Sequence, residues 1–377
     1  MILWLQPWLE SLWPPFHALQ YITLRAGLAA ALAFALALVL GRPLIRHLQR
    51  RGVRENAGDS DSPEVGRLAV AAGKDRVPTM GGVFWCGSIL LSTLLLADPT
   101  ELLVLLGAVL LVGMGTLGFL DDWVKWTREG GRNGLSRRAK LLLTVGLSVY
   151  VAVMLWNMGV RSGRPEISTI YFPVLKDVVA PTETLGTAGM VVFSAFTAFV
   201  ILAGCHSANI TDGMDGLAAG CGLVTTAALT VAVYAVGNVE LATYLHLPWI
   251  PGAGEVAVLG GAVMGATLGF LWFNCHPAQI FFGDSGSLPL GAILAYFAIV
   301  SKQELALPLL AGVFVLEAAS SLIQIYAFKL TGRRVFPIAP LHHVWQLRGM
   351  PEPKIVVRFW IVAAVSASLG LLLIKIR

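Results

Sequence analysis

Charged side chains are scarce in this chain. Only 13% of its 377 residues are Asp, Glu, Lys or Arg, and 56% are hydrophobic, whereas soluble domains average about 25% charged residues. A water-soluble surface needs charge, so burial in a soluble core does not explain a deficit of this size. A chain that turns apolar surface toward lipid needs much less charge. The composition therefore predicts an integral membrane protein.

Three further absences exclude other classes of protein. No basic stripe interleaved with aromatics is present and the net charge is only +5, so no nucleic-acid partner is expected. The N-terminal stretch lacks a basic segment followed by a small-residue cleavage site, so we expect no secretory signal there. Cys-X-X-Cys pairs are absent, and we expect small core residues rather than disulfides or metal ligands at Cys86, Cys205, Cys221 and Cys275.

Long apolar runs are abundant. Ten windows could cross the roughly 30 Å of hydrocarbon in a bilayer, with no internal repeat or soluble domain among them. They predict one all-α polytopic membrane domain over residues 1–377. The expected helices lie at about 22–45, 82–97, 102–120, 141–160, 187–206, 214–236, 255–272, 286–301, 305–328 and 357–374.

Lys and Arg are unevenly divided between the two sets of loops. The loops after the odd-numbered helices carry 19 of them, and the other side carries seven. The positive-inside rule then places the odd loops in the cytoplasm and both termini outside it. The predicted cytoplasmic segments that form the site are 46–81, 121–140, 207–216, 273–286 and 329–356.

Five unusual polar motifs fall on that same side. They are GKDRVPTMGG, GFLDDWVKW, NITDGMDG, FNCHPAQIFFGDSGS and APLHHVWQLRG, one after each odd-numbered helix. Segments that are far apart in the chain but share one side of the membrane can meet at helix ends. We therefore predict a single site assembled from five loops.

The residue types in these motifs suit metal-assisted phosphoryl transfer. Carboxylates and phosphate oxygens are the hard ligands that Mg²⁺ prefers, and cations and imidazoles suit phosphate oxygens. The acids are Asp121, Asp122, Asp212, Asp215 and Asp284, and the basic residues are Lys74, Arg76, Lys125, Lys140, His342 and His343.

Each motif also has a simpler interpretation on its own. The acids could be solvated charges at the interface or caps of the helices that follow, and the histidines could be satisfied by backbone groups. A transporter is a further alternative, but transporters keep ionisable sites near the bilayer midplane. Here Glu317 is the main acid well inside a predicted helix, and we assign it no role.

The motifs resemble those of the polyprenyl-phosphate N-acetylhexosamine-1-phosphate transferase superfamily. The matching stretches run from about residue 74 to 361 and include KDRVPTMGG, GFLDDWVK, NITDGMDGLA and FFGDSGS. The stretches APLHH and PEPKIVVRFW are similar to a narrower branch, the phospho-N-acetylmuramoyl-pentapeptide transferases. Two positions depart from the branch pattern: His206 stands where asparagine is common, and Val344 stands where a third histidine is usual.

The resemblance implies a reaction. Enzymes of this branch transfer phospho-MurNAc-pentapeptide from UDP-MurNAc-pentapeptide to undecaprenyl phosphate, with Mg²⁺, giving lipid I and UMP for peptidoglycan biosynthesis at the bacterial cytoplasmic (inner) membrane. A sister enzyme that transfers another hexosamine phosphate, such as GlcNAc-1-phosphate, is the nearest alternative, and PEPKIVVRFW argues against it. Oligomeric state, including a homodimer, stays open.

The resemblance also implies roles for individual residues. Asp284 would be the magnesium ligand, and Asp121 would be the base or the partner of the lipid phosphate, with Asp122 beside it. Phe281 would stack on uracil. His342 would be a further catalytic residue in contact with the substrate or its phosphates. The residues expected to bind the substrates are Lys74, Thr79, Lys125, Lys140, Asn209, Asp212, Asp215, Asn274 and His343.

Overall fold

The protein is a bundle of helices. We describe a computed structural model that covers residues 2–54, 66, 70, 73–128, 134–172 and 179–376. Parts of the predicted loops 46–81 and 121–140 therefore lie outside the described residues. Within the covered ranges the only sheet is an antiparallel pair, in which β1 (Thr169–Tyr171) lies beside β2 (Val179–Pro181).

The helices account for the membrane prediction. In the part of the chain that the structure describes, eight helices are long and apolar enough to cross a bilayer, and α4 and α11 are shorter apolar helices. The protein is therefore an all-α, multi-pass integral membrane protein. The helices are α1 (Ile2–Leu12), α2 (Ile22–Arg51), α4 (Gly82–Leu96), α5 (Leu102–Thr127), α6 (Arg137–Arg161), α7 (Gly186–Thr211), α8 (Leu217–Gly237), α9 (Val239–Leu245), α10 (Ala253–Asn274), α11 (Asp284–Val300), α12 (Leu307–Leu310), α13 (Gly312–Thr331), α14 (His342–Leu347) and α15 (Glu352–Ile376).

Every one of the ten apolar windows contains helix, but the boundaries differ from the expected ones. The apolar run of α5 ends near residue 120, whereas the helix continues through Thr127. Asp121 and Asp122 therefore lie in its last two turns rather than in a loop. The window 305–328 is divided between α12 and α13. Hydropathy locates the lipid-facing part of a helix, and polar residues can extend the helix where a neighbouring helix gives them partners.

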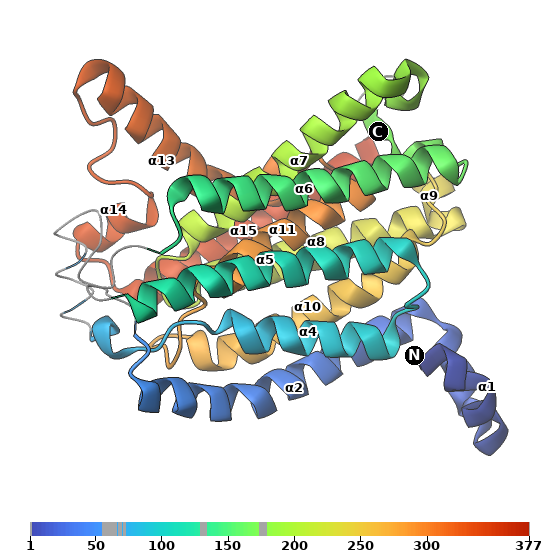
Figure 1. Ribbon diagram of the computed structural model, residues 1–377, viewed down its shortest axis with the longest axis horizontal. Coiled ribbons are helices and arrows are strands. Elements are labelled where there is room, and N and C mark those ends of the chain that lie inside the picture. The colour runs from blue at the N-terminus through green and yellow to red at the C-terminus, as the bar shows by residue number, and fades with distance from the viewer. Residues whose placement is uncertain are drawn as a thin grey trace.

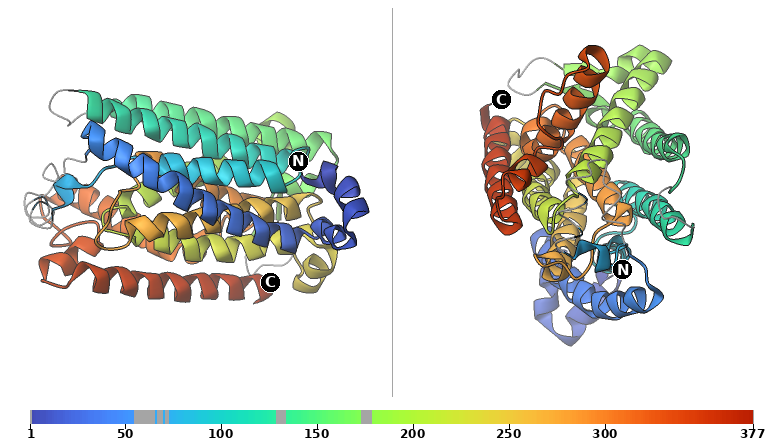
Figure 2. Two further views of the ribbon diagram at one scale, coloured as in Figure 1. Left: turned by 90° about the horizontal axis from the view of Figure 1, so that it is seen from below. Right: turned by 90° about the vertical axis from the view of Figure 1, so that its left-hand side faces the viewer.

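Helix α11 lies at the centre of the bundle. All of its residues are buried, and it packs against α4, α5, α7 and α8. Most of the long helices run roughly parallel, whereas α1, α7 and α13 splay from the bundle (Figure 1). The end-on view in Figure 2 shows the other helices arranged around this centre.

Two glycines let the N-terminal end of α11 approach its neighbours closely. A Cβ atom at Gly118 of α5 would lie only 2.0 Å from the carbonyl oxygen of Asp284. A Cβ atom at Gly82 of α4 would lie 2.1 Å from the backbone nitrogen of Gly286. Small residues at helix contacts allow backbones to meet in this way. The sequence thus brings the start of α11 directly against α4 and α5.

The four cysteines are all free, and their burial differs. Cys205 and Cys221 are buried, as predicted, and Cys86 is partly buried. Cys275 is exposed, so the prediction of a core residue was wrong there. It follows the last residue of α10 directly, where the chain leaves the packed part of the bundle.

The end of the bundle away from the polar motifs is held by a buried ion pair. Arg25 of α2 donates to both carboxylate oxygens of Glu255 in α10, at 2.7 and 2.5 Å, and to the carbonyl oxygen of Leu96. Both chain termini lie toward this end, and α14 lies at the other end (Figure 1).

Candidate active site

Three buried aspartates meet where α5 ends and α11 begins. Asp121 and Asp122 come from the last turns of α5, and Asp284 is the first residue of α11. One carboxylate oxygen of each lies within 4.8 Å of the others. The sequence predicted that these residues share one side of the membrane, and the structure brings them into one cluster, which we call the aspartate cluster.

Two lysines are bound to the aspartate cluster. Lys125 Nζ lies 2.8 Å from Asp121 Oδ2, 2.8 Å from Asp284 Oδ2 and 3.7 Å from Asp122 Oδ1. Lys140, in the first turn of α6, lies 2.5 Å from Asp284 Oδ2 and 3.5 Å from Asp121 Oδ2. Three carboxylates thus face two ammonium groups. With all five groups ionised, the net charge of the cluster is one negative charge.

Asp122 also holds the N-terminus of α11. Its two carboxylate oxygens accept the backbone N–H groups of Asp284, at 3.2 Å, and Ser285, at 3.0 Å. The first N–H groups of a helix have no partner within it, and an acid there is also favoured by the helix dipole. The capping alternative therefore applies, but the cap comes from α5 and not from Asp284 itself.

Asn209 connects α7 to the same cluster. Its amide Nδ2 donates to Asp284 Oδ1 at 2.5 Å and to the hydroxyl of Ser287 at 2.9 Å. Asp284 is thus approached from three helices other than its own, because Asn209, Lys125 and Lys140 come from α7, α5 and α6.

The donor set of the aspartate cluster fits a magnesium ion. Mg²⁺ takes hard oxygen ligands and usually binds through one or two carboxylates together with water and substrate phosphates. Three carboxylates with oxygens this close to one another supply such ligands. Sulfur and imidazole, which favour other metals, do not contribute to this cluster.

A second cluster of charges joins four of the predicted segments. Lys74 Nζ lies 3.0 Å from Asp215 Oδ1 and 2.6 Å from Glu352 Oε1. Asp215 Oδ2 lies 3.0 Å from His276 Nδ1 and accepts the backbone N–H of Ala278 at 3.1 Å. We call these four side chains the Lys74 cluster.

The charges of the Lys74 cluster favour the protonated lysine. Burial disfavours the ammonium, but the neighbouring carboxylates of Glu352 and Asp215 outweigh it, so the pKa of Lys74 is raised above its ordinary value. Lys74 therefore stays a cation throughout the physiological range, as a contact to an anionic substrate requires.

The turn after α7 is held by residues from two other segments. Asn274 Oδ1 accepts the backbone N–H of Gly216 at 2.9 Å, and its Nδ2 donates to the carbonyl of Ile280 at 2.8 Å. Trp360 Nε1 donates to the carbonyl of Gly216 at 3.1 Å. Both the oxygen and the nitrogen of the Asn274 amide thus bond backbone groups that shape the turn, and its nucleotide contact stays a prediction.

The segment that contains Thr79 packs against the segment that precedes Asp284. Phe281 donates its backbone N–H to the carbonyl of Pro78 at 2.8 Å and accepts from Gly81 N–H at 2.9 Å. Gly283 has a φ of +69°, and a Cβ atom there would lie 2.7 Å from Thr79 Oγ1 and 2.5 Å from Asp122 Oδ2. Glycine is needed at this position for both reasons. The Phe281 ring also lies 5.9 Å from Lys74 Nζ.

The two histidines lie side by side at the start of α14, with ring centroids 4.1 Å apart. His342 is fully buried, and its Nδ1 lies 3.0 Å from Glu317 Oε2. His343 is partly exposed and its Nδ1 lies 2.9 Å from Gln346 Oε1. Asp212 follows the last residue of α7 as its C-cap, at the start of the turn that carries Asp215.

His343 gives the protein a pH-dependent term in its stability. Burial and the adjacent His342 lower the pKa of His343 to about 3. The unfolded chain binds this proton at a higher pH than the folded one, so the stabilisation is complete above about pH 6.5 and is lost as the pH falls toward 3. We expect the melting temperature of detergent-solubilised protein to fall more between pH 7.5 and 5 than that of His343→Gln. Equal falls in the two proteins would contradict the assignment.

Structure explains one of the two departures from the branch pattern. Val344 is buried in a small apolar cluster with Ile338, packed by Leu341 and Leu347, so an apolar side chain suits the place of the third histidine. His206 lies on α7 one turn before Asn209, and among the described residues its buried Nε2 has no hydrogen-bond partner.

Several residues in or next to the two clusters received no role from the sequence. Glu352 and Trp360 belong to the PEPKIVVRFW stretch that marked the narrower resemblance, so a signal for them was present. His276 lies in FNCHPAQ, beside residues that we did single out. No signal pointed to Glu317 as the partner of a histidine, because the two residues are 25 positions apart and on different helices.

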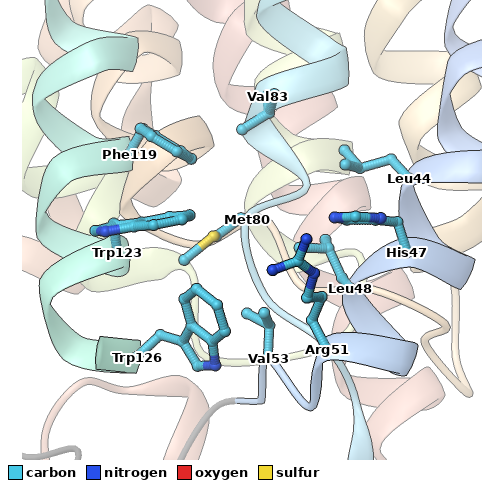
Figure 3. A pocket seen from close by; sticks show the side chains of 10 residues that line it. All are labelled: Leu44, His47, Leu48, Arg51, Val53, Met80, Val83, Phe119, Trp123 and Trp126. Atoms are coloured by element: carbon cyan, nitrogen blue, oxygen red, sulfur yellow. The ribbon is translucent and has the colours of Figure 1, made fainter. Parts of the chain in front are cut away.

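An apolar pocket of about 210 Å³ opens between the end of α5 and the end of α2 (Figure 3). Phe119, Trp123 and Trp126 of α5 form one wall, and the end of α2 forms the other, with His47 and Arg51 among its side chains. Met80 points into the pocket between the two walls. Its composition suits a lipid chain with an anionic head group.

Carboxylates, lysines and a turn rich in acids thus gather at one end of a bundle whose helices are long enough to span a membrane. Residues 102–302, from the start of α5 to just beyond α11, match the model of glycosyl transferase family 4. This is more than half of the chain, and the protein belongs to that family. It is a transferase of the phosphoglycosyl type, which moves a phospho-sugar to a polyprenyl phosphate.

Proposed function

We propose that this protein transfers phospho-MurNAc-pentapeptide from UDP-MurNAc-pentapeptide to undecaprenyl phosphate in the bacterial cytoplasmic membrane, giving lipid I and UMP in a Mg²⁺-dependent reaction. The general reaction follows from the family. The observation that carries the proposal is the part that PEPKIVVRFW takes in the site: Glu352 bonds Lys74 at 2.6 Å and the backbone N–H of Asp215 at 2.8 Å, and Trp360 bonds Gly216.

The narrower signature thus lies in contact with the turn that carries the nucleotide-sugar residues. Glu352 and Trp360 lie eight residues apart on α15, about two helical turns, so one face of that helix bonds the turn at both points. Because the PEPKIVVRFW stretch bonds this turn, we assign that stretch a role in donor specificity. This is why we prefer the muramoyl-pentapeptide donor to a simpler hexosamine donor.

In the proposed reaction an oxygen of the lipid phosphate attacks the phosphorus bonded to the sugar. The bond between that phosphorus and the bridging oxygen breaks, and UMP leaves with the electron pair. One phosphoanhydride replaces another. The acceptor is a phosphate monoester with a second pKa of about 6, so at neutral pH it has few protons left for a general base to remove.

The main barrier is then the repulsion between two anions, and cations must reduce it. Lys125 and Lys140 lie together at Asp284, and Asp121 fixes Lys125 from the other side at 2.8 Å. Asp121 also accepts the backbone N–H of Leu135 at 2.8 Å. It therefore positions the lysine that meets the lipid phosphate, rather than acting as a base.

Asp284 would hold the magnesium ion, with Asp121 and Asp122 close enough to contribute. When bound, the ion supplies Lewis-acid stabilisation of phosphate charge and orients the two substrates. The Lys74 cluster binds the donor, with Lys74 and His276 offering positive or hydrogen-bonding groups. Phe281, next to Lys74, offers a ring face for the base.

A covalent aspartyl-phosphate intermediate is the competing scheme. It would release UMP from the donor without any lipid acceptor, and it would leave a trapped phospho-enzyme. Direct attack predicts that UMP release requires both substrates. Incubation of the purified enzyme with donor alone, followed by detection of UMP and of protein-bound phosphate, separates the two schemes.

The substrate assignment is tested with purified protein in lipid nanodiscs and undecaprenyl phosphate as acceptor. We expect UMP release and lipid I formation with UDP-MurNAc-pentapeptide and neither product with UDP-GlcNAc. Turnover should be lost when EDTA removes divalent cations and should recover when Mg²⁺ is added. Turnover with UDP-GlcNAc alone would assign the protein to a sister activity. Turnover that survives EDTA would remove the metal.

A further inference from the structure

Glu317 is an acid placed inside an apolar helix. It lies in the second turn of α13 and is fully buried. One of its oxygens, Oε2, lies 3.0 Å from His342 Nδ1 and 3.5 Å from the backbone nitrogen of His342. Among the described residues, the other oxygen has no hydrogen-bond partner. The carboxylate therefore serves one residue of α14, through both its ring and its main chain.

His342 in turn faces the turn that carries the donor-binding acids. A Cβ atom at Gly213 would lie 2.4 Å from His342 Nε2 and 3.0 Å from Cε1, so the turn rests directly on the imidazole. Gly213 follows Asp212 and precedes Asp215 by two residues. Nε2 itself is buried and has no hydrogen-bond partner among the described residues.

This arrangement is costly for stability alone. A buried carboxylate with one bonded oxygen and a buried imidazole with one bonded nitrogen both leave polar groups unsatisfied. An apolar pair of the same volume would pack in their place at less cost. The pair does fix one thing that an apolar pair would not, namely the direction of the ring under Gly213.

We propose that Glu317 is a positioning residue that orients His342 and, through it, the turn from Asp212 to Asp215 that binds the nucleotide sugar. The contacts run from α13 to α14 and from α14 to the turn. The inference rests on the proposed function in one respect, since it takes the turn to be the donor site. It requires no contact between Glu317 and either substrate.

The first test compares Glu317→Leu and Glu317→Gln with the wild type as full-length protein in nanodiscs. For Glu317→Leu we expect kcat/KM for the donor to fall about 10- to 100-fold, as for loss of a partner that orients a binding group. The KM for the lipid acceptor should stay unchanged. The melting temperature should stay unchanged or rise. Glu317→Gln keeps an oxygen that accepts from Nδ1–H and should recover most of the activity.

A matched control is Glu304→Gln. Glu304 is a buried acid beyond the far end of α11, paired with Lys302 at 3.7 Å, and it touches neither cluster. This variant can lose stability, but its kinetic constants per folded molecule should equal those of the wild type. A fall in melting temperature without a change in kinetics for Glu317→Leu would make Glu317 structural only and would overturn the proposal.

The second test asks whether Glu317 acts through His342. The double variant Glu317→Leu, His342→Ala should be no worse than His342→Ala, because a positioning residue has no effect once its target is gone. Gly213→Ala should lose activity in the wild type, where its methyl group meets the ring, and should cause little further loss in the His342→Ala background. Additive losses in either pair would refute the chain of contacts.

These outcomes are distinguishable from failure of the proposed function. If the enzyme accepts UDP-GlcNAc instead of UDP-MurNAc-pentapeptide, the substrate assignment fails, and the same variants are then measured with the donor that is used. The positioning role stands or falls on the coupling between Glu317, His342 and Gly213, whichever nucleotide sugar occupies the site.

Discussion

Asp284→Asn is expected to lower turnover about a thousandfold or more, which corresponds to about 4 kcal/mol of lost transition-state stabilisation. Asp284 is the point where Lys125, Lys140 and Asn209 converge, and it is the proposed magnesium ligand. Asparagine has the same shape but carries no charge, so both lysines lose their shared anion and the cation loses its ligand. UMP release in nanodiscs measures the effect.

The variant should nevertheless fold and insert. The N-terminus of α11 is capped by Asp122 and not by Asp284, so the helix keeps its cap. The melting temperature and the elution profile should match those of the wild type. Glu240→Gln, an exposed acid on α9 at the far end of the bundle, is the control and should retain full activity. Substantial turnover of Asp284→Asn would remove Asp284 from the metal site.

Lys74→Met is expected to raise the KM for the nucleotide sugar about 100-fold, or roughly 3 kcal/mol. The lysine is the shared cation of Asp215 and Glu352. Methionine preserves much of its volume but leaves two buried carboxylates near each other and near an anionic donor. The KM for the lipid acceptor should change little, because the lysines of the aspartate cluster remain.

Lys354→Met supplies the matched control for that variant. Lys354 is exposed and lies two residues from Glu352 on the same helix. The Lys354→Met variant therefore removes the same charge without altering the Lys74 cluster. Initial rates over a range of donor concentrations, at saturating acceptor, give both constants. A fall in kcat with an unchanged KM for the donor would move Lys74 from donor binding to the chemical step.

Much of the architecture was accessible from hydropathy. Runs of apolar residues of bilayer length locate helices independently of what packs beside them, and each of the ten runs proved to contain helix. Helix ends were less accessible. Asp121 and Asp122 were expected in a loop, yet both belong to α5. The partners of Asp122 lie on α11 and the lysines beside Asp121 on α5 and α6, and no property of the local sequence announces them.

The candidate site, like the fold, could be predicted only in part. Charge counts and motif types were enough to group Asp121, Asp122, Asp215 and Asp284 on one side, since residues at the same ends of spanning helices share a side of the membrane. Their division into an aspartate cluster and a Lys74 cluster was not visible. The roles carried over from the resemblance, for these residues and for every other predicted site residue, remain predictions.

Composition, run length and loop charge alone established a multi-pass membrane protein with its acids gathered on one side, because each of these properties depends on single residues and their solvent. Which side chains bond to each other was decided by helix packing instead. Lys74 and Glu352 are 278 residues apart, and Asp122 and Ser285 are 163 apart. Which of many possible acids meets a given base depends on how closely Gly82 and Gly118 let the helices approach, and that is a property of the folded bundle.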